Sequence, residues 1–213
     1  MSDSEDLLVS SSRRVPLPSC AWRVFCALDI SEDVRTRLVD HIQRLRQAVP
    51  NVHASWSRAD NIHLTLKFFG DVEKDATKKL SAVAARVVQT FSPFHIRVGG
   101  TGTFPKQALP RVLWVGIEDP SGNLARLHAR FEDECAQEGF PKEERAFRPH
   151  LTLARIRKPE GSRSLGEIHK EIGFGPSEVV VPELLLMRSE LSSEGSKYTL
   201  ISRHIWRTFE NSD

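Results

Sequence analysis

The sequence predicts a mixed helix-and-strand domain assembled from two similar halves. Strand and helix patterns alternate along the chain, and Phe25 precedes His63 by 38 positions much as Trp114 precedes His150 by 36. With 213 residues and 39% hydrophobic content, the chain can bury a sizeable core. Alternation alone favours a parallel α/β sheet, whereas duplication of so short a unit also allows two lobes that face each other. The pattern leaves both arrangements open.

The first half is expected to contain, in order, a strand at 22–28, a helix from Ser31 to Pro50, a strand at 62–69, a helix at about 75–91 and a strand at 94–98. The first strand is a short apolar run that ends at an aspartate. The first helix has Ser31 as N-cap, acidic residues in its first turn and apolar residues at helical spacing. Gly70 is expected to stop the second strand. The second helix has one apolar face, and the third strand alternates.

The second half repeats the series with a strand at 112–117, a helix at about 121–138, a strand at 150–156, a short helix near 165–172 and strands at 179–187 and 197–206. Gly139 stops the longer helix, and the polar segment 192–196 suits a hairpin loop. We therefore expect one bilobal domain at 22–207, with pseudo-repeats at about 22–98 and 111–206. Flexible tails are expected at 1–21 and 208–213.

The charge balance and the cysteines narrow the class of protein. The formal net charge of +2, from 30 basic and 28 acidic residues, is far from the surplus of a protein that coats long duplex nucleic acid. Cys20, Cys26 and Cys135 form no CxxC pair, so we expect neither a disulfide framework nor a zinc ribbon. A reducing cytoplasm fits this cysteine usage best.

The sequence contains no sign of membrane insertion or export. The longest aliphatic stretch, 179–187, is interrupted by Pro182 and Glu183 and is shorter than the roughly 18 residues of a membrane span. The Ser-rich opening segment lacks the apolar centre of a signal peptide, and prolines follow Arg13-Arg14 where a twin-arginine signal would need an apolar run. We expect a soluble protein with no membrane partner.

Each half contains the tetrapeptide His-Leu-Thr-Leu on its expected second strand, beginning at His63 and at His150. Chance would produce such a pair with odds on the order of one in 10⁵. Side chains alternate along a strand, so His63 and Thr65 share one face, as do His150 and Thr152, while the leucines point to the core. Half-buried strands whose His and Thr merely face solvent are the alternative, and the matched repetition argues against it.

Two imidazoles and two hydroxyls suit phosphodiester hydrolysis. An imidazole with an ordinary pKa near 6.5 can be neutral in one place and protonated in another, so one histidine can take a proton while the other gives one. Hydroxyl donors can hold the phosphate oxygens. Neither motif contains an HExxH helix, a CxxC or an adjacent carboxylate pair, so we expect no metal.

Cationic side chains lie beside both motifs. Lys67 shares strand parity with His63, and Arg148 shares it with His150, so both are expected on the reactive face. Arg155 has the opposite parity and reaches that face only if the strand twists, bulges or ends there. Solvated surface charges are the alternative for all three.

The sequence resembles the two-histidine phosphoesterase superfamily, and within it the RNA 2′,3′-cyclic phosphodiesterases, historically called 2′-5′ RNA ligases. The resemblance extends over about 22–206 and is carried by segments 23–29, 56–70, 104–105, 110–116 and 147–155. It implies a bilobal α+β fold made by duplication, with largely antiparallel sheets and a central cleft. The tail before residue 22 extends beyond the family's usual start.

The resemblance also implies a reaction: water opens the 2′,3′-cyclic phosphate at an RNA 3′ end to a 2′-phosphate, with weak reverse ligation and no cofactor. By position, His150 would activate water and His63 would protonate the leaving oxygen. Thr65 and Thr152 would hold the phosphate, and Arg155 would help to neutralise it. The pseudo-symmetry leaves the acid and base roles exchangeable.

Several alternatives remain at this level. The same chemistry would serve a small cyclic nucleotide, a cyclic phosphate of ADP-ribose or a 2′-5′ oligonucleotide, and a non-catalytic RNA-end binding module is a different class. The aromatic residues Trp56, Phe69 and Phe147 lie near the motifs and could stack on a nucleobase, although each also fits the core. We expect a monomer.

Overall fold

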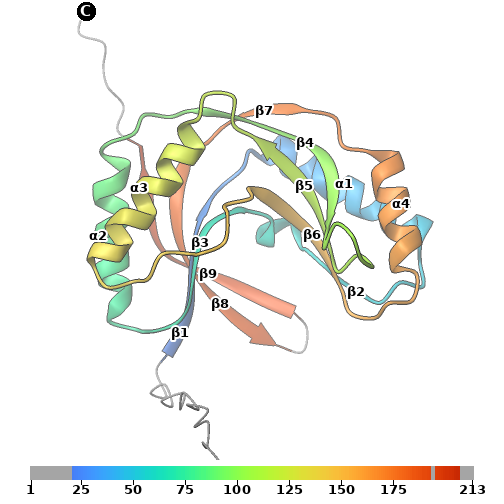
Figure 1. Cartoon of the computed structure of the whole chain (residues 1–213), viewed down its shortest axis with the longest axis horizontal. Coiled ribbons are helices and arrows are strands. Elements are labelled where there is room, and N and C mark those ends of the chain that lie inside the picture. The colour runs from blue at the N-terminus through green and yellow to red at the C-terminus, as the bar shows by residue number, and fades with distance from the viewer. Residues whose placement is uncertain (1–20, 193–194, 207–213) are drawn as a thin grey trace, which may run out of the picture.

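The computed structural model describes residues 21–192 and 195–206. The tails expected at 1–21 and 208–213 lie outside this range except for Ala21, and so does Cys20. The described chain forms one nine-stranded sheet and four α-helices (Figure 1). In order the elements are β1(Ala21–Leu28), α1(Glu32–Ala48), β2(Ala54–Trp56), a 3-10 turn (Ala59–Asn61), β3(Leu64–Glu73), α2(Ala76–Val88), β4(His95–Phe104), β5(Val112–Glu118), α3(Asn123–Gln137), β6(His150–Ile156), α4(Ser162–Ile172), β7(Ser177–Val180), β8(Glu183–Ser192) and β9(Gly195–Ile205).

The sheet is antiparallel throughout its described pairings. Its strand order is β7-β4-β5-β6-β3-β1-β8-β9, and β2 pairs with β6. The predicted α+β class with antiparallel sheets is therefore confirmed. The parallel α/β sheet that alternation alone favours is excluded, because each predicted strand–helix–strand unit returns its second strand antiparallel to the first.

Strands from the two ends of the chain are interleaved in the sheet. The strand that follows α2, β4, pairs with β5, and the strand β8, near the C-terminus, pairs with β1. The half of the curled sheet that contains β3, β1, β8 and β9 is covered by α2 and α3. The half that contains β7, β4, β5 and β6 is flanked by α1 and α4 (Figure 1). Each lobe thus contains strands from both halves of the sequence. The boundary between the two lobes therefore does not coincide with the boundary between the two sequence repeats.

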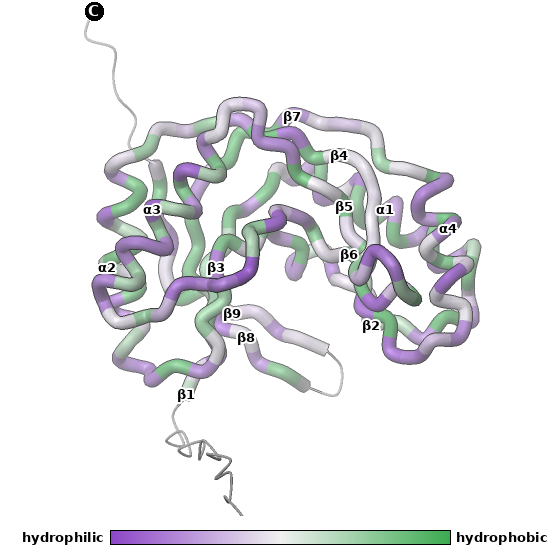
Figure 2. The backbone as a smooth tube through the Cα atoms, viewed as in Figure 1, coloured by the Kyte–Doolittle hydropathy of each residue, from purple (hydrophilic) through white to green (hydrophobic). Residues whose placement is uncertain are grey.

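The core lies between the helices and the outer face of the sheet. Leu38 of α1, Leu80 of α2, Phe131 of α3 and Leu165 of α4 are all fully buried. Apolar residues concentrate along the central strands and the inner faces of the helices, whereas the segment 141–148 that leads into β6 is strongly hydrophilic (Figure 2). Burial of the helix-facing side chains leaves the concave face of the sheet for polar residues.

Several element boundaries differ from the prediction. Gly70 does not end β3: with φ of 73° it carries the strand past a register shift to Glu73. The run predicted as one strand at 179–187 divides at Pro182 into β7 and β8, because proline cannot donate a ladder hydrogen bond. The short strand β2 was missed, and the predicted loop 192–196 is shorter because β8 and β9 extend into it.

Candidate active site

The two His-Leu-Thr-Leu motifs meet at the centre of the sheet. The strands β3 and β6 pair antiparallel at Leu64 and Leu151, the second residue of each motif. Both leucines are fully buried toward the helices, so the flanking His and Thr side chains point to the concave face. His63, which directly precedes β3, and His150, the first residue of β6, are thereby brought to one place although they lie 87 positions apart in the sequence.

Each motif ends in a β-bulge at its second leucine. In β6, Thr152 pairs with Trp114 and Ala154 with Leu113, so Leu153 is the extra residue. In β3, Thr65 pairs with Ala27 and Lys67 with Cys26, so Leu66 is extra in the same way. A bulge reverses the parity of the residues that follow it. The residue directly after each bulge is therefore buried, and the next one emerges on the concave face.

The two bulges determine on which face of the sheet the predicted cationic side chains lie. Arg155 was expected to reach the reactive face only if its strand twists, bulges or ends. The bulge at Leu153 turns it to the concave face beside Thr152. Lys67 is instead 6% exposed and turned toward α3 rather than toward His63, so it lines the second cavity but not the first, which His63 lines. Its Nζ lies 2.6 Å from Glu132 Oε2 and donates to the carbonyl oxygen of Pro141 at 2.8 Å.

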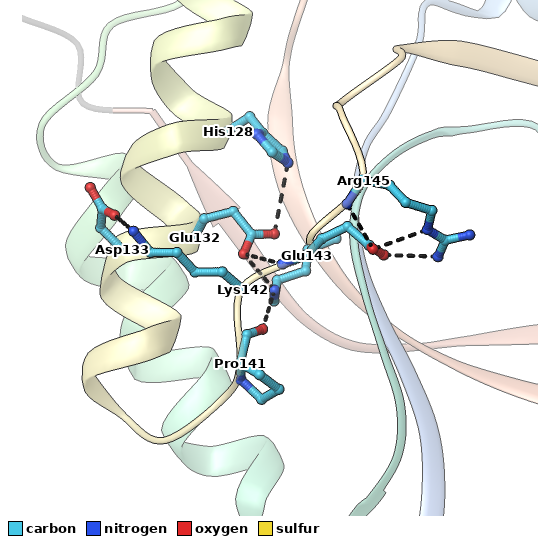
Figure 3. A network of polar contacts seen from close by, with 8 residues as sticks. His128, Glu132, Asp133, Pro141, Lys142, Glu143 and Arg145 are labelled. Carbon is cyan, nitrogen blue, oxygen red and sulfur yellow. Dashed lines mark hydrogen bonds and ion pairs between the residues drawn. The ribbon is translucent and has the colours of Figure 1, made fainter.

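Figure 3 shows the polar network around that ion pair. Glu132 Oε2 also accepts the backbone N–H of Glu143 at 3.2 Å, and His128 Nε2 lies 3.7 Å from Glu132 Oε1. Glu143 in turn binds the Arg145 guanidinium at 2.9 Å. This network anchors the segment 141–148 to α3, and that segment leads directly to His150.

His63 lies in an aromatic enclosure. Its ring stacks on Phe25 at a centroid distance of 4.7 Å, and Tyr198 of β9 meets it edge-on at 5.2 Å. Burial lowers the pKa of His63 to about 4, opposed by a backbone hydrogen bond with Asn61 and by Asp29. Arg35 of α1 holds the chain just before His63, because it donates to the carbonyl oxygens of Ala59 and Ile62 at 2.8 and 2.9 Å.

His150 has a similar setting from the other lobe. Phe104 meets its ring edge-on at 5.1 Å, and Trp114 lies at 6.3 Å. Its Nδ1 donates to the carbonyl oxygen of Arg148 at 2.7 Å, since a carbonyl can only accept. Burial lowers the pKa of His150, and the bond to Arg148 opposes that shift. Nε2 is then the ring nitrogen left for chemistry when the imidazole is neutral.

Two neighbouring cavities are lined by these histidines, the first by His63 and the second by His150. The first, of about 600 Å³, is lined by Phe25, Ala54, Ser55, Trp56, Ser57, Arg58, Asn61, His63, Thr65, Phe68, Thr152, Arg155, Arg157, Ser189, Gly195, Ser196 and Tyr198. The second, of about 660 Å³, is lined by Thr65, Leu66, Lys67, Phe68, Phe104, Val112, His128, Glu132, Glu143, Arg145, Ala146, Phe147, Arg148, His150 and Arg155. They share Thr65, Phe68 and Arg155.

The first cavity is suited to an anion. Arg58, Arg155 and Arg157 are among its lining residues, and within the described chain no aspartate or glutamate lines it. The surplus is local, since the whole chain is nearly neutral at +2. Serine, threonine and asparagine side chains supply hydrogen-bond donors on the same walls. No three His, Cys, Asp or Glu side chains of the described residues form a group that could hold a metal ion.

Three of the remaining predicted residues line the cavities. Trp56 of β2 lines the first cavity, and Arg148 and Phe147 line the second. Phe147 is stacked on His128 with centroids 4.0 Å apart and an interplanar angle of 9°. Phe69 is not at the site: it packs against Phe131 and Phe140 on the helix side of the sheet.

Some lining residues were not found from the sequence. Tyr198 comes from a strand far along the chain and has no local signal. Phe25 was recognised as a position matching Trp114, but its stacking on His63 depends on the pairing of β1 with β3. Phe68 was overlooked because its parity, without the bulge, places it in the core.

A known protein family and its named members are similar to this chain in sequence. The family model described as the 2′-5′ RNA ligase superfamily matches residues 34–192. A Methanothermobacter thermautotrophicus protein named RNA 2′,3′-cyclic phosphodiesterase is 33% identical over 180 residues, covering 83% of this chain and 95% of that protein.

Solved structures show the same fold. TT0787 of Thermus thermophilus has a TM-score of 0.73 at 27% identity, covering 87% of this chain and 98% of that one. LigT of E. coli, crystallised with 3′-AMP, has a TM-score of 0.66 at 26% identity, covering 88% of this chain and 99% of that one. Because the family model spans most of the chain and a relative over 30% identical aligns along nearly its whole length, this chain belongs to the 2′-5′ RNA ligase superfamily.

Proposed function

We propose that this chain hydrolyses the 2′,3′-cyclic phosphate at an RNA 3′ end to a 2′-phosphomonoester. The main support is the pairing of Leu64 with Leu151, which brings two histidines and two threonines to the walls of two neighbouring cavities. Membership of the superfamily and the name of the Methanothermobacter relative point to the same reaction. A cavity lined by arginines and by no described carboxylate suits a phosphodiester.

In this proposal His150 is the general base. Its Nδ1 proton is held by the Arg148 carbonyl, so the neutral ring presents Nε2 to a water molecule. The water oxygen attacks phosphorus and gives its proton to His150. The bond from phosphorus to the 3′ oxygen breaks, and His63 protonates that oxygen as it leaves. The products are a 2′-phosphate and a 3′-hydroxyl. The same path with an RNA 5′-hydroxyl in place of water would form a 2′-5′ phosphodiester and free the same 3′-hydroxyl, which is a weak 2′-5′ ligation.

Thr65 and Thr152 would donate hydrogen bonds to the non-bridging oxygens, and Arg155 would balance their negative charge. Thr65 and Arg155 line both cavities, and Thr152 lines the first, so all three border the space between the histidines. Charge-assisted hydrogen bonds of this kind are about twice as strong as neutral ones. Arg148 lines the second cavity, and Trp56 and Phe147 could contact the nucleotides that flank the phosphate.

We further propose that the protein acts as a monomer in the cytoplasm. Both cavities are formed within one chain, so a second copy is not needed to complete them. Cys26 and Cys135 are buried free thiols, which suits a reducing compartment. None of the described helices has the length and apolar run needed to cross a membrane.

The direct test uses an RNA oligonucleotide ending in a 2′,3′-cyclic phosphate, with EDTA present. We expect conversion to a 2′-phosphate, identified by ³¹P NMR and by mass spectrometry, and loss of turnover in His150→Ala. A parallel panel contains adenosine 2′,3′-cyclic phosphate, an ADP-ribose cyclic phosphate and a 2′-5′ dinucleotide. No turnover of the RNA end, or activity lost in EDTA and restored by zinc, would contradict the proposal.

A further inference from the structure

The proposed reaction places the ribose of the substrate in the first cavity. The 3′ oxygen stays on the ribose and takes its proton from His63, whereas water attacks from the side of His150. Attacking and leaving oxygens lie roughly in line through phosphorus, so they occupy opposite sides of the cyclic phosphate. His63 lines the first cavity and His150 lines the second. The ribose and its 5′ oxygen therefore lie on the side of the first cavity.

Arg157 brings a further positive charge to that cavity. It is exposed, lines the first cavity but not the second, and forms no ion pair with any residue that the structure describes. A cyclic phosphodiester carries one negative charge, which Arg155 balances in the proposed reaction. The charge of Arg157 is therefore left for another anion on the ribose side of the site.

Arg157 is held apart from Arg155. Two residues further along the chain, its Cα lies about 7 Å beyond that of Arg155 in an extended backbone, which is comparable to the separation of successive phosphates along an RNA strand. Its backbone N–H donates to the carbonyl oxygen of His53 at 2.7 Å, and its Nε donates to Ser55 Oγ at 2.8 Å.

The bond to Ser55 fixes the guanidinium without using all of its donors. Ser55 belongs to β2, the edge strand that pairs with β6, and it lines the first cavity. Nη1 and Nη2 of Arg157 have no hydrogen-bond partner among the described residues. A guanidinium held in this way can present two parallel N–H groups to a phosphate.

We infer that Arg157 binds the phosphodiester on the 5′ side of the terminal nucleoside, so that the preferred substrate is an RNA of at least two nucleotides. This inference rests on the proposed function, since it names the next part of the substrate beyond the cyclic phosphate and its ribose. A mononucleotide has only a hydroxyl at that place and leaves the guanidinium unused. Phosphate contacts position a strand without reading its sequence, so the preference does not depend on the base.

The test compares a dinucleotide with a mononucleotide. The kcat/KM is measured for the dinucleotide ApA ending in a 2′,3′-cyclic phosphate and for adenosine 2′,3′-cyclic phosphate. We expect the wild type to prefer the dinucleotide, and we expect Arg157→Gln to lower kcat/KM for the dinucleotide by about 10- to 100-fold. The value for the mononucleotide should remain that of the wild type, which also shows that the variant is folded.

A neutral backbone identifies the part of the dinucleotide that Arg157 contacts. Replacing the internucleotide phosphodiester by a methylphosphonate removes its charge and keeps both bases. The wild type should lose about as much kcat/KM on this analogue as Arg157→Gln loses on the normal dinucleotide. The two changes together should cost little more than either alone, because they remove the two partners of one contact.

Lys158→Gln is the matched control, because Lys158 is the next residue, is exposed and lines neither cavity. It removes the same charge and should leave the dinucleotide preference unchanged, since salt screens an exposed charge that makes no contact. Equal losses on both substrates in Arg157→Gln would overturn the inference, because Arg157 would then support Arg155 or the end of β6. Additive effects of the variant and the methylphosphonate would overturn it too, as would a wild type without preference for the dinucleotide.

A binding measurement separates this inference from the proposed function. Calorimetry gives the Kd of ApA carrying a 2′-phosphate and of adenosine 2′-monophosphate for the wild type and for Arg157→Gln. If neither cyclic phosphate is hydrolysed, the proposed function fails, and a loss of affinity for the dinucleotide alone still supports the phosphodiester contact. Equal Kd values of the two proteins for the dinucleotide would overturn the inference even if hydrolysis is observed.

Discussion

His41 Nε2 lies 3.0 Å from His169 Nδ1 in the fully buried space between α1 and α4. His169 Nε2 lies 3.0 Å from the carbonyl oxygen of Trp114, which can only accept, so His169 carries its proton on Nε2. Its Nδ1 must then accept from His41 Nε2. His41 Nδ1 is left with a lone pair and no partner among the described residues. The hydrogen bond between the two rings therefore requires a neutral His169, and a proton on His41 Nδ1 would have no acceptor among the described residues.

This pair predicts a loss of stability in mild acid. Burial, with His169 and Arg44, lowers the pKa of His41 from its ordinary 6.5 to about 4. Because the folded value lies below the unfolded one, the unfolded chain takes up the proton first as the pH falls. The stability is full above about pH 6.5 and declines as the pH approaches 4, by about 3 kcal/mol for this group.

Urea denaturation between pH 4 and 7 measures that decline. In His41→Leu the free energy of unfolding should vary less steeply with pH over this range, because unfolding of the variant takes up about one proton fewer. His63 and His169, whose pKa values are also lowered, remain and keep part of the slope in both proteins. A wild-type slope in the variant would mean that His41 is protonated in the folded state and that the neutral chain of hydrogen bonds is wrong.

The ion pair of Lys67 and Glu132 should matter for stability rather than for phosphate binding. Lys67→Met leaves a buried carboxylate without its partner, which typically costs about 3 to 5 kcal/mol. Lys67→Met combined with Glu132→Leu should regain most of that loss. The exposed pair of Lys78 and Asp75 is the matched control, and Lys78→Met should change the free energy of unfolding by less than about 1 kcal/mol.

Comparison of these variants by urea denaturation also tests the bulge. If Lys67→Met unfolded like wild type but lost kcat/KM for a cyclic phosphate, Lys67 would face the substrate as simple parity suggests. The bulge at Leu66 would then be misplaced.

Much of the fold could be predicted from periodicity. The helices and most strands fall within a few residues of their expected places, because apolar spacing and Ser31, Gly139 and similar end signals are local. Strand direction could not be predicted, because the same alternation of strands and helices is compatible with parallel and antiparallel pairing. The resemblance resolved that choice. The three-residue strand β2 is too short to carry a period.

The sequence was sufficient to predict the site residues from the histidine to the threonine of each motif, which is the part of each strand before its bulge. The repeated motif was sufficient to single out His63 and His150, because alternation holds from the histidine to the threonine. The extra residue Leu66 in β3 exchanges the positions of Lys67 and Phe68, and the corresponding extra residue in β6, Leu153, brings Arg155 to the cavity. A bulge is defined by pairing with the neighbouring strand, so it has no signature in the strand's own sequence.

The two threonines should contribute to phosphate handling but not to the fold. Thr65→Val and Thr152→Val each replace the hydroxyl by a methyl of similar size and keep the β-branched shape. We expect kcat/KM for a cyclic phosphate to fall by about 10- to 100-fold, as for loss of a hydrogen bond to a charged group. Thr199→Val, at an exposed position on β9, should retain wild-type activity. Unchanged kcat/KM in both motif variants would show that the hydroxyls do not contact the phosphate.

The histidine pair should behave as one unit. His63→Ala and His150→Ala are each expected to lower kcat by about 10²- to 10⁴-fold, and the double variant should fall little further. Steady-state rates with an RNA cyclic phosphate measure these losses. Near-normal kcat in either single variant would return that histidine to a structural role.

The pH profiles of kcat and of kcat/KM should both be bell-shaped. They should differ, because kcat/KM reports the free enzyme and kcat reports the enzyme with substrate bound. Burial lowers the pKa of His63 to about 4 and that of His150 below its ordinary value, so a protonated acid is scarce in the empty site near neutral pH. A bound phosphate anion favours the protonated imidazole. The alkaline limb of kcat should therefore lie at higher pH than that of kcat/KM, with both limbs belonging to the coupled pair. Coincident limbs would contradict this effect of the phosphate.

A leaving group of low pKa separates the two roles, which the pH profile alone does not. Such a group departs with little protonation, so an enzyme without its general acid should recover activity on it, while an enzyme without its base should not. With a p-nitrophenyl phosphodiester, His63→Ala should approach the wild-type rate and His150→Ala should stay impaired. The Nδ1 bond to Arg148 favours this assignment, because it holds His150 with Nε2 free to accept. Rescue of His150→Ala alone would exchange the two roles and leave the two-histidine mechanism in place, whereas rescue of neither would mean that departure of the 3′ oxygen does not limit the rate.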